Sequence, residues 1–260
     1  MISVVIPTYK NPQYLDLCLH SLYETQTYEN EVIIVVDGEI EISREVLDKY
    51  PNTKVLDLGV NRGINVATNW GVYNATNEFV LIVNDDNVFP KNWDTVLVGY
   101  QKRGEVITPN MIEPNPSMFR QLVIKNLGQD IESFNLDEFW DYESTIPSKN
   151  FNKEGSTFPL MMSKFDYISV GGLDIMYPSN HVSDWDLFLK CEYVGFKMIR
   201  IYDIHFYHFV SKATRKTKEM DQEATRKEIE AHKFFKLKWG QNAEHNPLDN
   251  SKMLRIFQQK

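Results

Sequence analysis

The sequence has few cysteines and no long apolar run. Its two cysteines, Cys18 and Cys191, lie far apart in a chain of 260 residues, which argues against a disulfide framework and against a cysteine-based zinc site. No stretch approaches the roughly 18 apolar residues of a transmembrane helix, and the first residues lack the basic and apolar regions of a secretory signal. We therefore expect a soluble, cytoplasmic protein with a substantial core and no transmembrane segment.

Two common phosphate-binding motifs are also missing. No Gly-x-Gly-x-x-Gly follows the first apolar stretch and no Gly-x-x-x-x-Gly-Lys-Ser/Thr occurs, so a dinucleotide dehydrogenase or a P-loop phosphotransferase has little support. The net charge of −8 argues against nucleic acid as a partner, but not against a small phosphate bound through a metal ion. Residues 212–238 carry a local charge of +4, which indicates a solvated helix or, alternatively, peripheral contact with a membrane or an anionic acceptor.

Strand and helix patterns alternate along the first third of the chain. Apolar, β-branched runs predict strands at residues 2–6, 31–36, 54–58 and 79–83, and helical spacing predicts helices at 12–22 and 43–50. Asn11 is expected to cap the first helix, with Pro12 in its first turn. This alternation predicts right-handed crossovers and a largely parallel sheet, with ligands at the carboxyl ends of its strands.

Polar side chains follow three of these strands. Tyr9 and Asp37 each come just after a strand, and the run 79–83 leads into Asn84, Asp85 and Asp86. Adjacent carboxylates need a cation or hydrogen-bond donors nearby, and carboxylate oxygens suit Mg²⁺ or Mn²⁺. An acidic turn would explain the last group equally well. The shared position at strand ends favours a common binding crevice.

Small residues recur every four positions in the next segment. Gly63, Ala67, Gly71 and Ala75 would form one smooth ridge on a helix, which allows close packing on a sheet or against a flat ligand. Asn61 and Arg62, which precede the ridge, could meet a phosphate, although loop polarity alone would also account for them.

Four motifs, in this order and at this spacing, resemble family 2 of the nucleotide-sugar glycosyltransferases. They are Val4–Tyr9, Val35–Gly38, Asn61–Gly63 with Ala67, Asn69 and Gly71, and Asn84–Asp86. The resemblance implies an α/β chain with the GT-A fold, in which helices flank a mostly parallel, Rossmann-like sheet. It also implies a nucleotide-sugar-binding half at residues 1–105, an acceptor-binding half of the same domain at 106–210, and a C-terminal helical extension at 211–260.

The resemblance also assigns roles to the first half. Pro7, Thr8, Tyr9 and Asp37 would line the nucleotide-base pocket, with Asp37 accepting a hydrogen bond from the base. Asn84, Asp85 and Asp86 would correspond to the Asp-x-Asp metal motif, with Asn84 replacing its first acid. We expect Asp86 to be the direct ligand of Mn²⁺ or Mg²⁺ and Asp85 to contact the ribose or a metal-bound water.

The second half contributes the remaining candidates. A strand is predicted at 106–109, a strand at 158–163, and a helix at 165–170 closed by Gly171 and Gly172. The aromatic, acidic segment at 130–143 is expected over the acceptor cleft, although packing in a core or a lid is the commoner role of such aromatic residues. By resemblance, Asp184 is the general base and Asp186 the helix-opening acid behind it. A strand at 197–202 and a long helix at 218–238 follow. His208, with His205 as second choice, would be the late metal ligand of such enzymes.

These residues are candidates for transfer of a sugar from a nucleotide diphosphate to a hydroxyl of a glycan or other acceptor, and the resemblance implies that the transfer is inverting and that UDP is the expected nucleotide. Arg62 would assist the metal at the leaving group. One alternative is a non-catalytic sugar-nucleotide or glycan-binding protein on a decayed enzyme fold, because Asn84 replaces an acid. A sugar-phosphate nucleotidyltransferase is a weaker alternative, because Pro7–Pro12 occupies the place of its glycine-rich loop.

Overall fold

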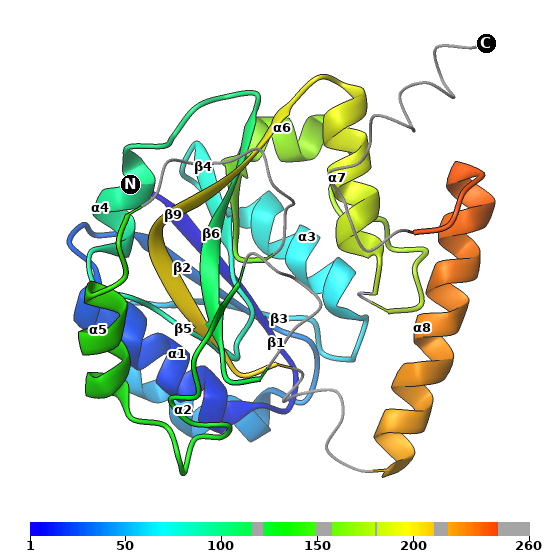
Figure 1. Ribbon diagram of the computed structural model, residues 1–260. Coiled ribbons are helices and arrows are strands. Elements are labelled where there is room, and N and C mark those ends of the chain that lie inside the picture. The colour runs from blue at the N-terminus through cyan, green and yellow to red at the C-terminus, as the bar shows by residue number, and fades with distance from the viewer. Residues whose placement is uncertain (116–121, 149–157, 180, 211–217, 244–260) are drawn as a thin grey trace.

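The computed structural model describes residues 1–115, 122–148, 158–179, 181–210 and 218–243, which fold around one mixed, largely parallel sheet (Figure 1). Its strands are β1 (Ser3–Thr8), β2 (Glu31–Val36), β3 (Lys54–Asp57), β4 (Phe79–Ile82), β5 (Asn87–Val88), β6 (Glu105–Glu113), β7 (Val123–Ile124), β8 (Leu160–Ser163) and β9 (Lys197–His208). The helices are α1 (Pro12–Thr25), the short 3₁₀ helix η1 (Ile40–Ser43), α2 (Arg44–Lys49), α3 (Ile64–Asn74), α4 (Trp93–Val98), α5 (Leu136–Ser144), α6 (Lys164–Ser169), α7 (Ser183–Tyr193) and α8 (Lys218–Trp239).

The strand order joins the two expected halves in one sheet. The order is β3-β2-β1-β4-β8-β6-β9-β5, with β7 paired to β6. β1 runs parallel to β2 and β4, and β6 runs parallel to β9. β8 is antiparallel to both β4 and β6 and connects these two groups. The predicted boundary at residue 105 therefore falls within a continuous sheet, and the functional division of the chain stays a prediction.

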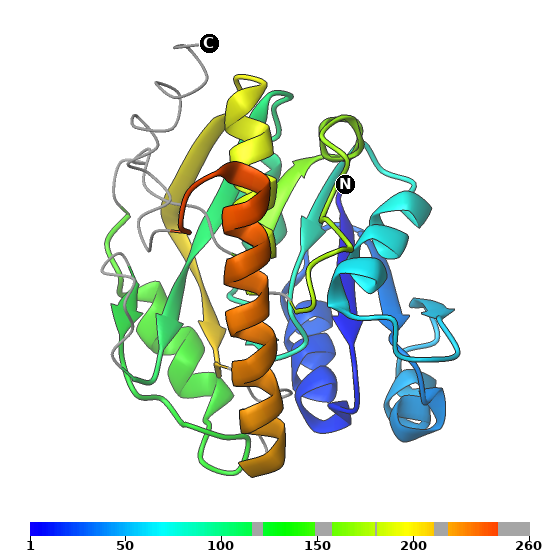
Figure 2. The same cartoon turned by 90° about the vertical axis from the view of Figure 1, so that its right-hand side faces the viewer.

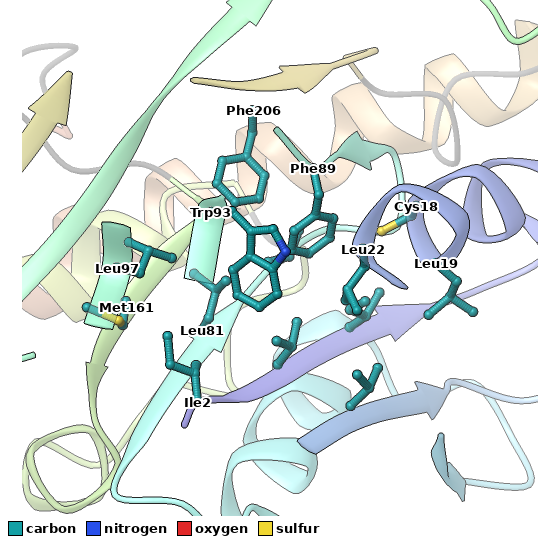
Figure 3. Packing of buried hydrophobic residues seen from close by; sticks show 14 of the residues in the cluster. Ile2, Cys18, Leu19, Leu22, Leu81, Phe89, Trp93, Leu97, Met161 and Phe206 are labelled. Carbon is teal, nitrogen blue, oxygen red and sulfur yellow. The ribbon is translucent and has the colours of Figure 1, made fainter. Parts of the chain in front are cut away.

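Each face of the sheet has its own apolar core. Beneath α1, α2 and α4, Phe89 packs against Trp93 and Phe206, with ring centroids 5.0 Å apart in both pairs (Figure 3). The other face is covered by α3, α6, α7 and α8, which contribute buried residues such as Leu187 and Phe235. Helices on both faces bury the apolar side chains of the strands, as a largely parallel sheet requires. No helix in the described part of the chain could span a bilayer.

The predicted ridge of small residues brings α3 close to the sheet. A Cβ atom on Gly71 would lie 2.3 Å from Val5 Cγ1 and 2.9 Å from Val35 Cγ2, so a side chain there would push the strands away. Ala67 is fully buried in the same interface. Packing on the sheet is thus confirmed, and it sets the start of α3 beside the carboxyl ends of β1 and β2.

Two strands run further than the sequence predicts. β6 continues past Pro109 to Glu113, because the register of the β6–β9 pair shifts between Pro109 and Asn110 and accommodates the proline. β9 continues past Tyr202 to His208 as the neighbour of this longer β6. The predicted ends were wrong, and the additional residues carry Glu113 and His208 to the candidate site.

Candidate functional site

A pocket of about 310 Å³ lies at the carboxyl ends of β1 and β2. Its lining includes the predicted residues Pro7, Thr8, Tyr9, Asp37, Asn61 and Asp85. These residues meet because the parallel strands β1, β2 and β4 end at the same edge of the sheet. Residues at the start of α3, in the segment before α7 and on α8 form the rest of the lining. The structure thus gathers most of the residues predicted for the nucleotide into one pocket.

Asp37 holds the loop that leads into α3. Its Oδ1 accepts a hydrogen bond of 2.6 Å from the Arg62 amide, and its Oδ2 accepts one of 2.9 Å from the Gly63 amide. Burial raises the pKa of Asp37, although these donors stabilise the ionised form. Each carboxylate oxygen keeps a second lone pair for a ligand. The Arg62 side chain is exposed and lines neither pocket described here, so its contact with phosphate stays a prediction.

Asp85 is tied to the loop between β1 and α1. Its Oδ2 accepts a hydrogen bond of 2.7 Å from Thr8 Oγ1, and its Oδ1 accepts one of 3.1 Å from Asn11 Nδ2. Asn11 does occupy the N-cap position of α1, as predicted, but its side chain makes no capping hydrogen bond and turns to the buried Asp85 carboxylate instead. Pro12 does lie in the first turn of α1, as predicted. Asp85 faces the 310 Å³ pocket.

A second pocket, of about 170 Å³, adjoins the first, and Ile64 lines both. Asn84 borders the second pocket, whereas Asp85 borders the first. Asp86 lies next to His208, which also lines the second pocket. Asn84, Asp85 and Asp86 thus have three different surroundings, although they are consecutive in the segment after β4.

Pairing between β5 and β9 sets Asp86 beside His208. Asn87 lies opposite His208 in this antiparallel pair, and the Phe209 amide donates to the Asp86 carbonyl at 3.2 Å. His208 Nε2 is 3.6 Å from Asp86 Oδ1. Two ligands about 2.1 Å from one ion are roughly 3 Å apart in octahedral geometry, so a small side-chain shift would let both bind a divalent cation. Across the described ranges no group of three or more His, Cys, Asp or Glu side chains is arranged to hold a metal ion.

Glu113 is the site residue that the sequence reasoning missed. Its Oε1 lies 2.9 Å from His208 Nδ1, and its side chain is buried. When Nδ1 carries the proton it donates to Glu113, which leaves the Nε2 lone pair on the side of Asp86. Burial lowers the pKa of His208, but the carboxylates of Asp86 and Glu113 outweigh burial and raise the pKa overall. The sequence did contain a sign of this role, because Glu113 is an acidic residue at the end of an apolar strand. Asp37 after β2, and Asp85 and Asp86 after β4, have the same kind of position.

The second-choice ligand, His205, lies elsewhere. It is buried, and its Nδ1 is 3.6 Å from Glu143 Oε1 on α5. His205 and His208 are separated by an odd number of positions along β9, so they point to opposite faces of the sheet. The structure therefore places only one of the two histidines, His208, beside Asp86.

The aromatic residues of the segment at 130–143 pack into a core of their own. Phe139 on α5 is fully buried, and the rings of Phe134 and Tyr207 are 4.8 Å apart in a core between α5 and β9. No residue of this segment lines either of the two pockets. Core packing, the commoner role expected for these aromatic residues, is thus what the structure shows for Phe134 and Phe139, because large apolar rings gain from burial.

Asp184 lines the second pocket from the first turn of α7. Its Oδ1 accepts a hydrogen bond of 2.9 Å from the Trp185 amide, and burial raises its pKa to about 6 against this stabilisation. Asn65 on α3 positions this turn, since its Oδ1 accepts a bond of 3.1 Å from Ser183 Oγ and its Nδ2 donates to the Asp174 carbonyl at 3.1 Å. Helix α3, packed on the sheet, therefore fixes Asp184 relative to the strand ends.

Asp186 lies in the first turn of α7, as predicted, and it also makes contacts with α8 that the sequence did not indicate. It is fully buried and accepts hydrogen bonds from the Tyr177 hydroxyl at 3.2 Å and from Trp239 Nε1 at 2.8 Å. Lys190 Nζ and Lys238 Nζ lie 3.1 Å and 2.7 Å from its carboxylate. Because two of these partners belong to α8, Asp186 fixes the end of α8 to α7.

The architecture matches solved structures with the GT-A fold. The crystal structure of S. aureus TarS superposes with a TM-score of 0.61 at 17% identity, over 89% of this chain and 43% of TarS. GalNAc-T7, solved with UDP, GalNAc and Mn²⁺, superposes with a TM-score of 0.61 at 16% identity, over 80% of this chain and 43% of GalNAc-T7. At these identities the likeness establishes the fold, and the expected α/β GT-A class is confirmed.

Sequence comparison identifies the family. Residues 3–151 match Glycosyl transferase family 2, and the chain belongs to this family. Uncharacterized glycosyltransferase YibD of Escherichia coli (strain K12) is 35% identical over 102 residues, which are 37% of this chain and 29% of YibD. The matching region thus spans less than a third of that relative. Asp184 and His208 lie beyond the family match, so their assignment depends on the geometry given above.

Proposed function

We propose that this chain is an inverting glycosyltransferase that moves a sugar from a nucleotide-diphosphate sugar to a hydroxyl of a glycan or another acceptor. One observation carries the proposal. Asp184 and His208 line the 170 Å³ pocket, and Asp86 lies beside His208. The 310 Å³ pocket, which is large enough for a nucleotide, adjoins them. This arrangement offers a base for the acceptor and a charged site for the leaving group within one crevice.

The 310 Å³ pocket is the nucleotide site of this proposal. Pro7, Thr8 and Tyr9 contact the base together with Asp37, and Asp85 contacts the ribose or a metal-bound water. Asn61, which lines this pocket, faces the phosphates, and the exposed Arg62 side chain would turn towards them when the donor binds. UDP is the first nucleotide to test, because GalNAc-T7, which has the same fold, is solved with UDP.

Asp184 is the general base. Its pKa of about 6 leaves the carboxylate mostly ionised at pH 7 and more basic than an ordinary aspartate, so it can take the proton of the acceptor hydroxyl. The hydroxyl then attacks the anomeric carbon from the face opposite the diphosphate, which inverts the stereochemistry. General-base catalysis of this kind contributes about 10²- to 10⁴-fold in rate.

Asp86 and His208 would hold Mn²⁺ or Mg²⁺, which supplies Lewis-acid stabilisation of the departing diphosphate. Glu113 keeps the His208 proton on Nδ1, so that Nε2 is available as a ligand. Asn84 is neutral and the Asp85 carboxylate accepts hydrogen bonds from Thr8 and Asn11, so Asp86 is the carboxylate of this motif that faces the cation. The raised pKa of His208 indicates a local field that favours positive charge.

Glu113→Gln is expected to weaken the response to metal without abolishing it. The neutral amide holds the imidazole less strongly, and loss of such a partner typically lowers metal affinity about 10- to 100-fold. The Mn²⁺ concentration for half-maximal activity should rise by about that factor. Glu105→Gln, at the other end of β6, is the matched control and should not change it. An unchanged Mn²⁺ response in Glu113→Gln would refute the positioning role.

The test of the proposed function is a thermal-shift screen of UDP-, GDP- and dTDP-sugars with and without Mn²⁺, followed by an assay for released nucleoside diphosphate. A ligand that binds only the folded chain raises its apparent stability, by about 2.7 kcal/mol at 100 times Kd. We expect a shift that depends on Mn²⁺ and release that depends on an added acceptor. Binding without any release would instead favour the non-catalytic binding protein.

A further inference from the structure

Helix α8 supplies part of the wall of the 310 Å³ pocket. Met220, Glu223, Ala224 and Lys227 line it together with Pro7–Tyr9. They are spaced three and four positions apart, so they share one face of the helix. None of them belongs to the family match, which ends at residue 151. The pocket built from the strand ends is thus completed by a helix of the C-terminal extension.

One end of α8 is firmly attached to the body of the protein. Ala231 and Phe235 are its only buried residues, and both belong to its C-terminal half. There Lys238 Nζ lies 2.7 Å from both Asp174 Oδ2 and Asp186 Oδ1. Figure 2 shows α8, coloured orange to red, standing in front of the sheet with its N-terminal end towards the bottom. The attached end therefore fixes the direction in which the exposed half extends over the pocket.

The face of α8 that meets the pocket suits a nucleotide. Met220 and Ala224 present apolar atoms, and the methionine thioether adapts readily to a flat ligand. Lys227 adds a positive charge next to them, although Glu223 Oε1 lies 3.5 Å from its Nζ. A nucleotide base is bound well when an apolar surface lies against each of its two faces, and the phosphates of the nucleotide need positive charge nearby. The strand-end wall, with Asp37 and Asp85, supplies hydrogen-bond acceptors but no cation of its own among the lining residues.

We propose that the N-terminal half of α8 is the second wall of the donor site, so that the nucleotide base lies between Pro7–Tyr9 and the side chains of Met220 and Ala224. This inference depends on the proposed function, because it assigns further residues to the same nucleotide. It predicts that nucleotide affinity is set partly by a helix that the family match does not include.

The test measures the Kd of UDP in the presence of Mn²⁺ by calorimetry, using the full chain. Ala224→Glu puts a negative side chain into the pocket and should raise Kd at least about 10-fold through steric overlap and repulsion of the phosphates. Ile229→Glu adds the same charge to the same helix at a residue that is 52% exposed and does not line the pocket. Its Kd should stay within about twofold of wild type, once charge screening is considered.

Met220→Ala gives an independent measurement if Ala224→Glu disturbs the helix. Loss of the thioether contact should raise Kd by about 3- to 10-fold with an unchanged circular dichroism spectrum. Wild-type affinity in Met220→Ala, and in Ala224→Glu if it folds, would overturn the role of α8 and leave the proposed function standing. A wild-type chain that binds neither UDP nor GDP with Mn²⁺ would overturn both proposals together.

Discussion

Asp184→Asn is expected to lose about 10²- to 10⁴-fold in kcat while it folds more stably than the wild-type chain. The amide has the shape of the carboxylate and can still accept the Trp185 amide hydrogen bond, but it cannot take a proton from the acceptor. Binding of the donor should change little, because Asp184 lines the 170 Å³ pocket and not the 310 Å³ pocket that is proposed to bind the nucleotide. A fall in kcat with an unchanged Kd for UDP is therefore the expected pattern.

The gain in stability has a definite dependence on pH. The folded-state pKa of Asp184 is about 6 against an ordinary value of 3.8, so the folded chain binds this proton more tightly than the unfolded chain does. The free energy of unfolding therefore falls as pH rises from about 4 to 6, because the folded chain has to ionise this buried group. Above about pH 6 the destabilisation is at its full value and no longer changes with pH. The shift corresponds to at most about 3 kcal/mol, and partial exposure to solvent reduces it to roughly 1–3 kcal/mol.

Chemical denaturation of Asp184→Asn and wild type at pH 4 and pH 7.5 measures this difference. We expect the variant to be more stable at pH 7.5 and the two proteins to converge near pH 4. Asp137→Asn is the matched control, because Asp137 is an exposed carboxylate in the first turn of α5. It should keep full activity and lose about 0.3–1 kcal/mol of its favourable interaction with the helix dipole. Full activity of Asp184→Asn would remove the base assignment.

The strand-end residues could be predicted because their position depends on local pattern and on one general rule. An apolar run marks each strand, the polar residue after it marks the carboxyl end, and parallel neighbours bring these ends together. Tyr9, Asp37 and Asp85 line one pocket for this reason alone. The ridge that includes Gly71 could also be predicted, because close packing needs small residues at helical spacing.

Other contacts depend on long-range register that a sequence pattern does not encode. Glu113 meets His208 only because β6 continues through Pro109 and the β6–β9 register shifts there. Asp186 has the appearance of a helix-opening acid, yet its partners Lys238 and Trp239 come from a helix more than 50 positions later. The same holds for the pocket wall from α8, because the charges of this segment indicate a solvated helix or peripheral contact with a membrane or an anionic acceptor, and not a pocket wall.

Asp86→Asn is expected to abolish the part of donor binding that depends on metal. Its carboxylate lies 3.6 Å from His208 Nε2, whereas the carboxylate of Asp85 accepts hydrogen bonds from Thr8 and Asn11. Asp86→Asn and Asp85→Asn should therefore have different effects on binding of the donor. Asp86→Asn should bind UDP equally with and without Mn²⁺ and lose at least about 10²-fold in kcat, since the leaving diphosphate is no longer stabilised.

Asp85→Asn should keep its response to Mn²⁺ but bind uridine more weakly, because the amide no longer accepts both hydrogen bonds that shape the β1–α1 loop. It should also lose about 1–3 kcal/mol of stability from these buried partners. Calorimetry of UDP and of uridine, each with and without Mn²⁺, separates the two residues, because uridine has no phosphate to bind a metal. If Asp85→Asn lost the Mn²⁺ response and Asp86→Asn kept it, Asp85 would be the metal ligand. The Asp85 side chain would then accept hydrogen bonds from Thr8 and Asn11 only in the metal-free protein.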